Sequence, residues 1–287
     1  MPELLGVAFE LLVAITVLVT ALTIGLDTTA AEFGSVVRGR RAVIAMLGVN
    51  GVVVPVAAFA LVNALPVQGA DQTGVLLCAM CASGPLGLKA SQIARGDLAW
   101  AISITTILTV LNVAFLPLWT SLLLPDSVTA RPVDLLGAMV AIIILPLVAG
   151  IWYRRRRPEH AGGVVPRLEA LSNVTLALAV TVGLVAHFDQ VWLTASSWTP
   201  IVVVILLALA GPAGYFASGP PQGLRRVSTL VTINRGTGIA LLLASRSFAD
   251  QAHVLSTVIA FGILQTIIVL AAALVWRRRS MTEATAR

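Results

Sequence analysis

The stretch that decides the fold covers residues 79–97 and reads AMCASGPLGLKASQIARGD. It begins as an apolar helix, is interrupted by Ser-Gly-Pro-Leu-Gly at residues 83–87, and resumes around Lys89, the single lysine of the chain. A second interruption, INRGTG, lies at residues 233–238. Glycine tolerates unusual backbone angles, and proline cannot donate a helical hydrogen bond. The sequence therefore predicts two broken helices that are far apart in the chain.

Composition places these helices in a membrane. Of the 287 residues, 58% are hydrophobic and 11% are charged, and the mean hydropathy is +0.95. A water-soluble domain of this size is far less apolar. Apolar runs recur at the length of about 20 residues that crosses a hydrocarbon core of about 30 Å. We expect an all-α integral membrane protein in which residues 1–287 form a single membrane domain.

Nine membrane spans are predicted, at residues 4–26, 42–65, 73–94, 98–124, 133–153, 168–188, 199–217, 224–245 and 253–276. The two interruptions fall in the third and eighth spans. Pro55 and Pro212 lie inside the second and seventh spans, and we expect them to kink these helices.

The distribution of basic residues predicts the topology. With the N-terminus outside, most of the 19 Lys and Arg residues fall on the cytoplasmic side, including those of a short tail at residues 277–287. The positive-inside rule requires this asymmetry. We expect a multi-pass protein of the cell (inner or plasma) membrane. Its net charge of +6 then favours contact with the anionic lipid bilayer rather than with nucleic acid.

Two cations, Lys89 and Arg235, fall inside the broken spans. A charge within the membrane is costly and needs a partner or a function. Each break is also followed by a new helix start, whose free N–H groups attract an anion. Paired interruptions in the two halves of a chain are typical of the midplane binding site of a secondary transporter. Three simpler explanations stay open: glycines that permit close helix packing, a structural ion pair for Arg235, and a snorkelling Lys89.

Several short motifs carry a family resemblance. They are Gly25-Leu26-Asp27, the sequence RGDLA at residues 95–99, SITT at residues 103–106 and GTGIA at residues 236–240. With these motifs the chain resembles the bile acid–sodium symporter superfamily over about residues 15–276. The resemblance implies an inverted repeat with two broken crossing helices. It also implies a core formed by residues 42–124 and 199–276 and a panel formed by residues 4–26 and 133–188.

The departures from this family concern its sodium ligands. Where relatives supply oxygen ligands, this chain has Gly87, Leu88 and Ala101, although Thr105 is kept. Arg235 aligns with a family glutamine. We therefore hypothesise a secondary transporter of a small organic anion that works by alternating access without sodium, in which Arg235, with Lys89 as a second candidate, replaces the sodium charge.

The candidate residues for binding the substrate or an ion are polar groups and glycines near the two breaks. They are Asn50, Ser83, Gly84, Gly87, Lys89, Ser91, Thr105, Asn112, Thr232, Asn234, Arg235 and Thr237. Glu10 lies inside the first predicted span and could be a counter-ion or a proton carrier. Sodium is disfavoured as the coupling ion, and a proton remains an alternative.

Three other functions stay as alternatives. The first is a sodium-coupled organic-anion symporter of the bile-acid type. The second is an arsenite-type efflux permease, because Cys78 and Cys81 precede the first break and cysteine is a soft ligand. The third is a non-transporting membrane sensor or scaffold. We expect no enzyme, metal site or cofactor, since catalytic and phosphate-binding motifs are missing from the sequence.

Overall fold

The computed structural model describes residues 2–29, 39–82, 84–124, 132–248 and 251–285, and these residues form helices and connections without strands. The helices are α1 (Pro2–Asp27), α3 (Arg40–Gly48), α4 (Val54–Ala64), α5 (Ala70–Met80), α6 (Pro85–Ile93), α7 (Leu98–Leu123), α8 (Pro132–Met139), α9 (Leu145–Arg156), α10 (Pro158–Ala186), α11 (Phe188–Ala195), α12 (Thr199–Ala217), α13 (Gln222–Ile233), α14 (Thr237–Ser247) and α15 (Ala252–Thr285). Two wider π-helical turns, η1 (Val49–Val53) and η2 (Val140–Ile144), precede α4 and α9. The prediction of an all-α membrane protein is confirmed.

The described residues contain eight helical segments that are long and apolar enough to cross a membrane, one fewer than predicted. The difference is the predicted span at residues 73–94, which consists of α5, with 11 residues, and α6, with 9 residues. Each is shorter than the bilayer core. The second broken helix, α13 followed by α14, is counted as one segment, Gln222–Ser247.

Two helices extend beyond the predicted spans. The span expected at residues 168–188 belongs to α10, which already begins at Pro158. The tail expected at residues 277–287 continues α15 as far as Thr285. In both places the polar sequence contains good helix formers, and a proline in the first helical turn is compatible with a helix.

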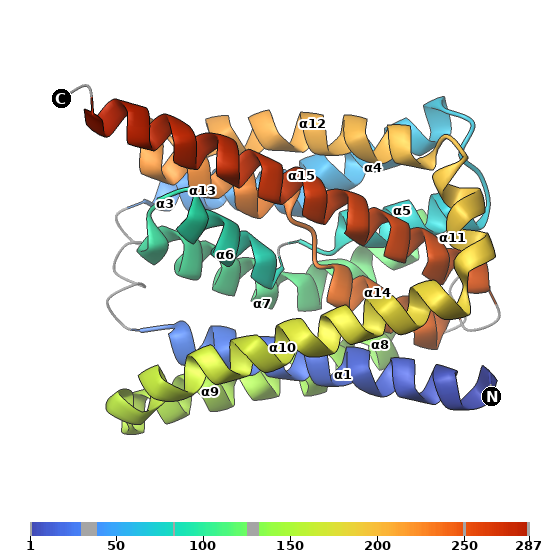
Figure 1. Ribbon diagram of the computed structural model, residues 1–287, viewed down its shortest axis with the longest axis horizontal. Coiled ribbons are helices and arrows are strands. Elements are labelled where there is room, and N and C mark those ends of the chain that lie inside the picture. The colour runs from blue at the N-terminus through green and yellow to red at the C-terminus, as the bar shows by residue number, and fades with distance from the viewer. Residues whose placement is uncertain (1, 30–38, 83, 125–131, 249–250, 286–287) are drawn as a thin grey trace.

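Three helices, α1, α9 and α10, form one layer on a side of the molecule (Figure 1). We call them the three-helix layer. Gly25 and Gly150 let α1 and α9 approach closely, because a Cβ at either position would collide with the backbone of the other helix. Hydroxyl pairs join α1 to α10, with Thr16 Oγ1 donating to Thr175 Oγ1 at 2.8 Å. The layer is thus held together by close packing and internal hydrogen bonds.

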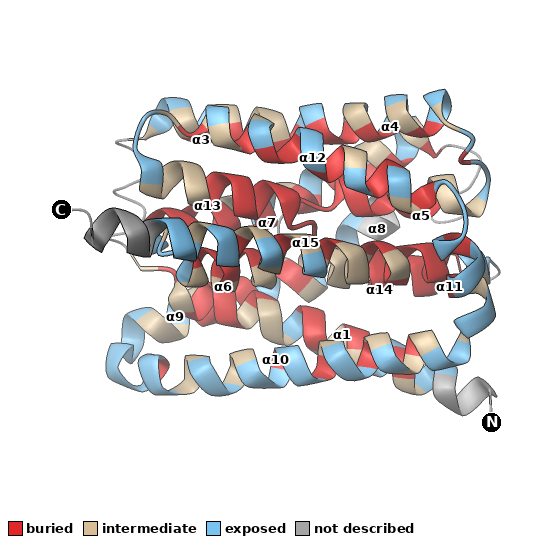
Figure 2. Cartoon of the chain, turned by 45° about the horizontal axis from the view of Figure 1, so that its top comes forward, coloured by how far each residue is buried: buried red, intermediate tan, exposed pale blue. Residues whose placement is uncertain are grey.

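The broken helices lie inside the bundle. In the most apolar window of Gln222–Ser247, 78% of the residues are buried, whereas the share is 22% in the window of Pro158–Ala186. Figure 2 shows the same contrast, with α13, α7 and α14 mostly buried and the outer side of α10 exposed. A helix surrounded by protein can expose free backbone groups to neighbouring side chains rather than to lipid.

The expected disturbance at Pro55 takes the form of the π-helical turn η1. Pro55 cannot donate to the carbonyl of Gly51, and the indole Nε1 of Trp119 donates to that oxygen at 2.7 Å instead. The turn also carries the fully buried Asn50. Pro212, by contrast, lies inside the continuous helix α12.

Candidate functional site

The two helix breaks meet in the interior of the bundle. The backbone N–H of Gly236, in the second break, donates to the Cys81 carbonyl of the first at 2.8 Å. The amide Nδ2 of Asn234 donates to the Gly84 carbonyl at 2.7 Å. Two unwound segments that were 150 residues apart in sequence thus supply each other's missing backbone partners.

Each break is also held by one buried amide side chain from the next long helix. Asn112 of α7 accepts a hydrogen bond from Ala82 N at 2.8 Å and donates to Ala82 O at 2.5 Å. Gln265 of α15 does the same for Arg235, accepting from its N–H at 2.8 Å and donating to its carbonyl at 3.0 Å. In both cases the amide follows the clamped residue by 30 positions. We call these two contacts the amide clamps.

The Arg235 side chain is 1% exposed and is surrounded by oxygen atoms. Its guanidinium donates to Asn50 Oδ1 at 2.8 Å and to the Ala79 carbonyl at 2.5 Å. Longer contacts of 3.4 Å reach the carbonyls of Thr232 and Asn50. In the part of the chain that the structure describes, no carboxylate pairs with Arg235, and its Nε lacks a partner. The buried positive charge is therefore stabilised by amide and peptide oxygens, which is how a protein also surrounds a small hard cation.

A cavity lies beside the crossing, between it and the three-helix layer. Gly84, Gly236 and Gly238, at the starts of α6 and α14, form one wall. The remaining lining residues come mostly from α1 and from neighbouring apolar side chains, and they are Thr16, Val17, Thr20, Ala21, Ile24, Thr109, Ile143, Leu176 and Ile239. We call it the central cavity. Arg235 does not line it, so the structure brings the helix starts to the cavity while the guanidinium lies behind them.

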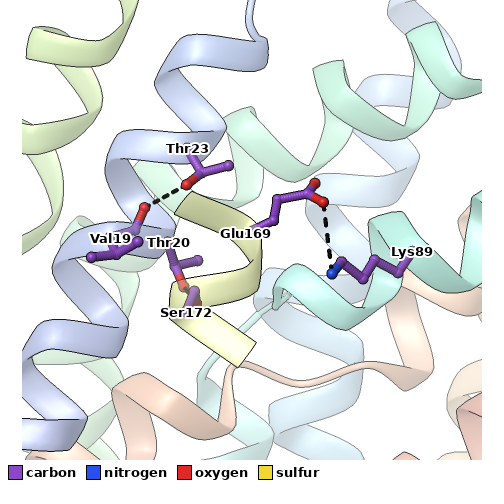
Figure 3. Close-up of polar contacts among 6 residues, drawn as sticks. All are labelled: Val19, Thr20, Thr23, Lys89, Glu169 and Ser172. Atoms are coloured by element: carbon purple, nitrogen blue, oxygen red, sulfur yellow. Dashed lines mark hydrogen bonds and ion pairs between the residues drawn. The ribbon is translucent and has the colours of Figure 1, made fainter. Parts of the chain in front are cut away.

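A second cavity contains the other predicted cation. Lys89 Nζ lies 3.6 Å from Glu169 Oε2, and these side chains connect α6 with α10. Figure 3 shows Lys89 and Glu169 facing each other beside Thr20, Thr23 and Ser172. The lining residues of this ion-pair cavity are Thr20, Thr23, Ile24, Asp27, Leu88, Lys89, Thr105, Glu169, Ser172 and Asn173.

The predicted residues fall into three groups. Asn50, Gly84, Asn112, Thr232, Asn234, Arg235 and Thr237 take part in the hydrogen bonds of the crossing, and Gly87 packs against Asn234. Lys89 and Thr105 line the ion-pair cavity. The structure does not bring the others to the crossing: Ser91 donates to the Gly87 carbonyl of its own helix, Glu10 is exposed on α1, and Ser83 lies outside the described residues.

The cysteines are both buried and free. Cys81 contributes its carbonyl to the crossing, as described above. Within the described ranges, no group of three or more His, Cys, Asp or Glu side chains could hold a metal ion. The geometry therefore gives the metalloid alternative no additional ligands.

Sequence reasoning missed two important side chains. Gln265 is a single polar side chain in an apolar part of a long helix, and only the fold reveals its contact with Arg235. Glu169 was not chosen as a candidate because it lay at the edge of the predicted span, which began one position before it. In the structure, α10 begins at Pro158. The sequence did not show that Glu169 lies well inside a long helix.

Two interrupted helices that cross beside a cavity, inside a multi-pass helical membrane protein, define the architectural class of secondary transporters. The sequence model of the Sodium Bile acid symporter family matches residues 14–193. The chain belongs to the sodium bile acid symporter family, as its motifs suggested. Members of that family are transporters rather than enzymes.

The relatives of this chain are distant in sequence. The chain is 25% identical over 236 residues to a probable chloroplastic sodium/metabolite cotransporter of Oryza sativa subsp. japonica, with 80% of this chain and 55% of the relative covered. It is 25% identical over 162 residues to an uncharacterized sodium-dependent transporter of Bacillus subtilis (strain 168), with coverages of 55% and 50%. It is 22% identical over 250 residues to a sodium-dependent organic anion transporter of Rattus norvegicus, with coverages of 80% and 64%. The chain thus covers between half and two thirds of the length of these relatives.

Proposed function

We propose that this protein is a secondary transporter that moves a small organic anion through the central cavity by alternating access. The observation that carries the proposal is the convergence of two helix starts on one cavity. Gly84 and Gly236, which precede α6 and α14, both line it. Helix starts carry partial positive charge and free N–H groups, and both favour an anion.

The lining of the cavity suits an anion with an apolar body. Besides the two helix starts, its polar lining side chains are the hydroxyls of Thr16, Thr20 and Thr109, while most of the remaining wall is aliphatic. Apolar pockets with a few convergent polar groups are typical of small-molecule sites. The name of the relative from Rattus norvegicus, a sodium-dependent organic anion transporter, supports the same substrate class.

For the moving parts, we propose an inverted repeat in which residues 4–26 and 133–188, which include most of the three-helix layer, act as a panel and residues 42–124 and 199–276 act as the core. The two amide clamps support this repeat, because Ala82 with Asn112 and Arg235 with Gln265 occupy corresponding positions at equal spacing. We further propose an outside N-terminus and a cytoplasmic C-terminus in the cell membrane, on the basis of the arginine distribution.

Sodium coupling is the version of this function that the relatives support, since all three relatives described above carry sodium in their names. Thr105, whose buried Oγ1 lacks a partner among the described residues, is an oxygen that such an ion could use. We therefore take sodium-coupled symport as the first candidate.

Sodium-independent transport is a second candidate, and the Arg235 environment favours it. The guanidinium occupies a group of oxygens that would otherwise suit a cation, and it brings a permanent positive charge to the crossing. A cation at the same place would be repelled by that charge and would compete for the same oxygens.

Uptake into proteoliposomes distinguishes these candidates. Purified protein would be tested with radiolabelled monocarboxylates, dicarboxylates and a bile acid, with and without an inward sodium gradient, alongside Arg235→Gln. The first candidate predicts uptake that requires sodium, whereas the second predicts equal uptake in potassium medium and its loss in Arg235→Gln. Movement of arsenite but of no organic anion would favour the permease alternative. Failure to move any of these compounds would favour a sensor or scaffold.

A further inference from the structure

Three cavities lie in a row along α1. The central cavity and the ion-pair cavity share Thr20 and Ile24 as walls. On its other side the central cavity shares Val17, Ile143 and Ile239 with a third cavity, which reaches Arg246. The row therefore runs between the three-helix layer and the broken helices, with a cation at each end.

The Lys89–Glu169 pair closes one end of this row. Lys89 belongs to α6, one helical turn after the start that faces the central cavity, and Glu169 belongs to the three-helix layer. The pair thus connects the two bodies that must move relative to each other in alternating access. Any such motion at this end has to stretch or break the contact.

The geometry of the pair makes it easy to break. The separation of 3.6 Å is longer than the 2.7–2.9 Å of a well-formed hydrogen bond between charged groups. The side chains are 32% and 25% exposed, so water competes for both charges. A carboxylate that arrives along the row could replace Glu169 on Lys89 at little cost.

The same cavity contains an unused polar group. Thr105 is 1% exposed, it lines the ion-pair cavity, and its Oγ1 has no hydrogen-bond partner among the described residues. Buried hydroxyls are nearly always hydrogen-bonded. An unpartnered hydroxyl beside a lysine is therefore a second, independent sign that a polar ligand is received here.

We propose that Glu169 occupies the place of the substrate's carboxylate on Lys89, so that the ion pair is a gate that a carboxylate anion opens by displacing Glu169. This inference rests on the proposed function, and it names Lys89 as the residue that receives the anionic group. Once displaced, Glu169 no longer ties α10 to α6. The anion then binds to Lys89 and the Thr105 hydroxyl while the three-helix layer is released from α6.

The test measures how open the cavity is, without requiring transport. Thr23 lines the ion-pair cavity and is 6% exposed, so a cysteine placed there in a Cys78→Ala/Cys81→Ala background should react slowly with a bulky maleimide in the purified full chain. Glu169→Gln and Lys89→Met should each raise the labelling rate at least fivefold. Glu159→Gln is the matched control, because Glu159 is an exposed glutamate of the same helix. Lys89→Arg should retain the slow rate.

Added carboxylates separate a gate from a merely structural ion pair. Acetate, benzoate and cholate should accelerate labelling of the otherwise native protein, whereas benzamide, which has no charge, should not. In Lys89→Met the carboxylates should have no effect. The proposal is overturned if Glu169→Gln labels as slowly as Glu159→Gln, if none of the three carboxylates changes the native rate, or if they accelerate Lys89→Met equally. Normal uptake in Glu169→Gln and Lys89→Met would overturn the gate alone, whereas a responsive gate without uptake of any anion would overturn the proposed function alone.

Discussion

Gln265 holds Arg235 by both of its backbone polar groups, accepting from the N–H at 2.8 Å and donating to the carbonyl at 3.0 Å. Its Nε2 also reaches Thr237 Oγ1 at 2.9 Å, in the first turn of α14. One amide therefore fixes both sides of the second break. Asn112 has the equivalent relationship with Ala82 in the first break.

The amide clamps predict large effects from removing either side chain. Gln265→Met keeps the approximate shape of the side chain but leaves the N–H and carbonyl of Arg235 buried without partners. Each of these two unsatisfied groups costs about 1–3 kcal/mol, so we expect a loss of roughly 2–6 kcal/mol in the free energy of unfolding. Asn112→Leu should have a comparable effect. Thermal unfolding in detergent measures both, and Gln92→Met, at an exposed position, is the matched control. A melting temperature equal to that of the control would show that the clamps do not stabilise the breaks.

The contact between Asn50 and Arg235 predicts different stabilities for two substitutions of Asn50. Asn50→Leu removes the oxygen that lies 2.8 Å from the guanidinium and should cost about 1.5–3 kcal/mol, the usual contribution of a hydrogen bond to a charged group. Asn50→Asp supplies a carboxylate to the unpaired charge and should be clearly more stable than Asn50→Leu. In the sodium-independent candidate, Asn50→Asp should nevertheless reduce anion uptake, because it neutralises the positive charge at the crossing.

The control for this pair is Asn63→Leu, since Asn63 is an exposed asparagine of α4 whose Nδ2 donates to the carbonyl four positions before it, as Asn50 also does. Melting curves and uptake should be measured on the same preparations. Equal stability of Asn50→Leu and Asn63→Leu would contradict the assigned role of the Asn50 oxygen.

Gly84 predicts a steric effect at the wall of the central cavity. Its backbone is extended, with φ −144° and ψ 170°, so alanine is allowed there on conformational grounds. The added Cβ would lie 3.1 Å from both the Arg235 carbonyl and Asn234 Nδ2. Overpacking of this kind costs about 1–3 kcal/mol, and it would separate the two breaks. We expect Gly84→Ala to lower the melting temperature and the uptake rate together.

Gly48→Ala is the appropriate comparison for this change. Gly48 ends α3, and a Cβ there would meet no atom within 4 Å. Because alanine favours a helix over glycine by up to about 1 kcal/mol, this variant should melt at the same or a higher temperature. A lower melting temperature for Gly48→Ala than for Gly84→Ala would refute the steric argument.

The sequence predicted the broken helices well because glycine and proline act locally. Residues 83–87 and 236–238 are unfavourable in an ordinary membrane helix, and the structure has its breaks just before or within them. Helix α5 ends at Met80 and α6 begins at Pro85, while α13 ends at Ile233 and α14 begins at Thr237. The involvement of Arg235 also followed from a local fact, since a charge in the middle of an apolar span needs partners. Its partners were predicted only in part, because Asn50 was identified and Gln265 was not.

The sequence could not show how far inside a helix each charged residue lies or which residue it faces. Glu169 looked like the edge of a span, and only the ten additional residues of α10 before it place it inside a long helix opposite Lys89. Glu10 looked interior but is exposed. A one-dimensional pattern gives the position of a charge along a helix, whereas the face that the charge occupies depends on how several helices pack.

The hydrogen bonds that hold the breaks come from η1, α5, α7, α13, α15 and the breaks themselves. The three-helix layer supplies none of the bonds named in that set. A sliding motion of the layer past the crossing therefore leaves the polar interior of the crossing intact and strains polar contacts only at the boundary with the layer, such as the Lys89–Glu169 pair. In kinetic terms, substitutions at the crossing should change the amount of folded protein as well as transport, whereas substitutions at the boundary with the layer should change mainly how fast each molecule works.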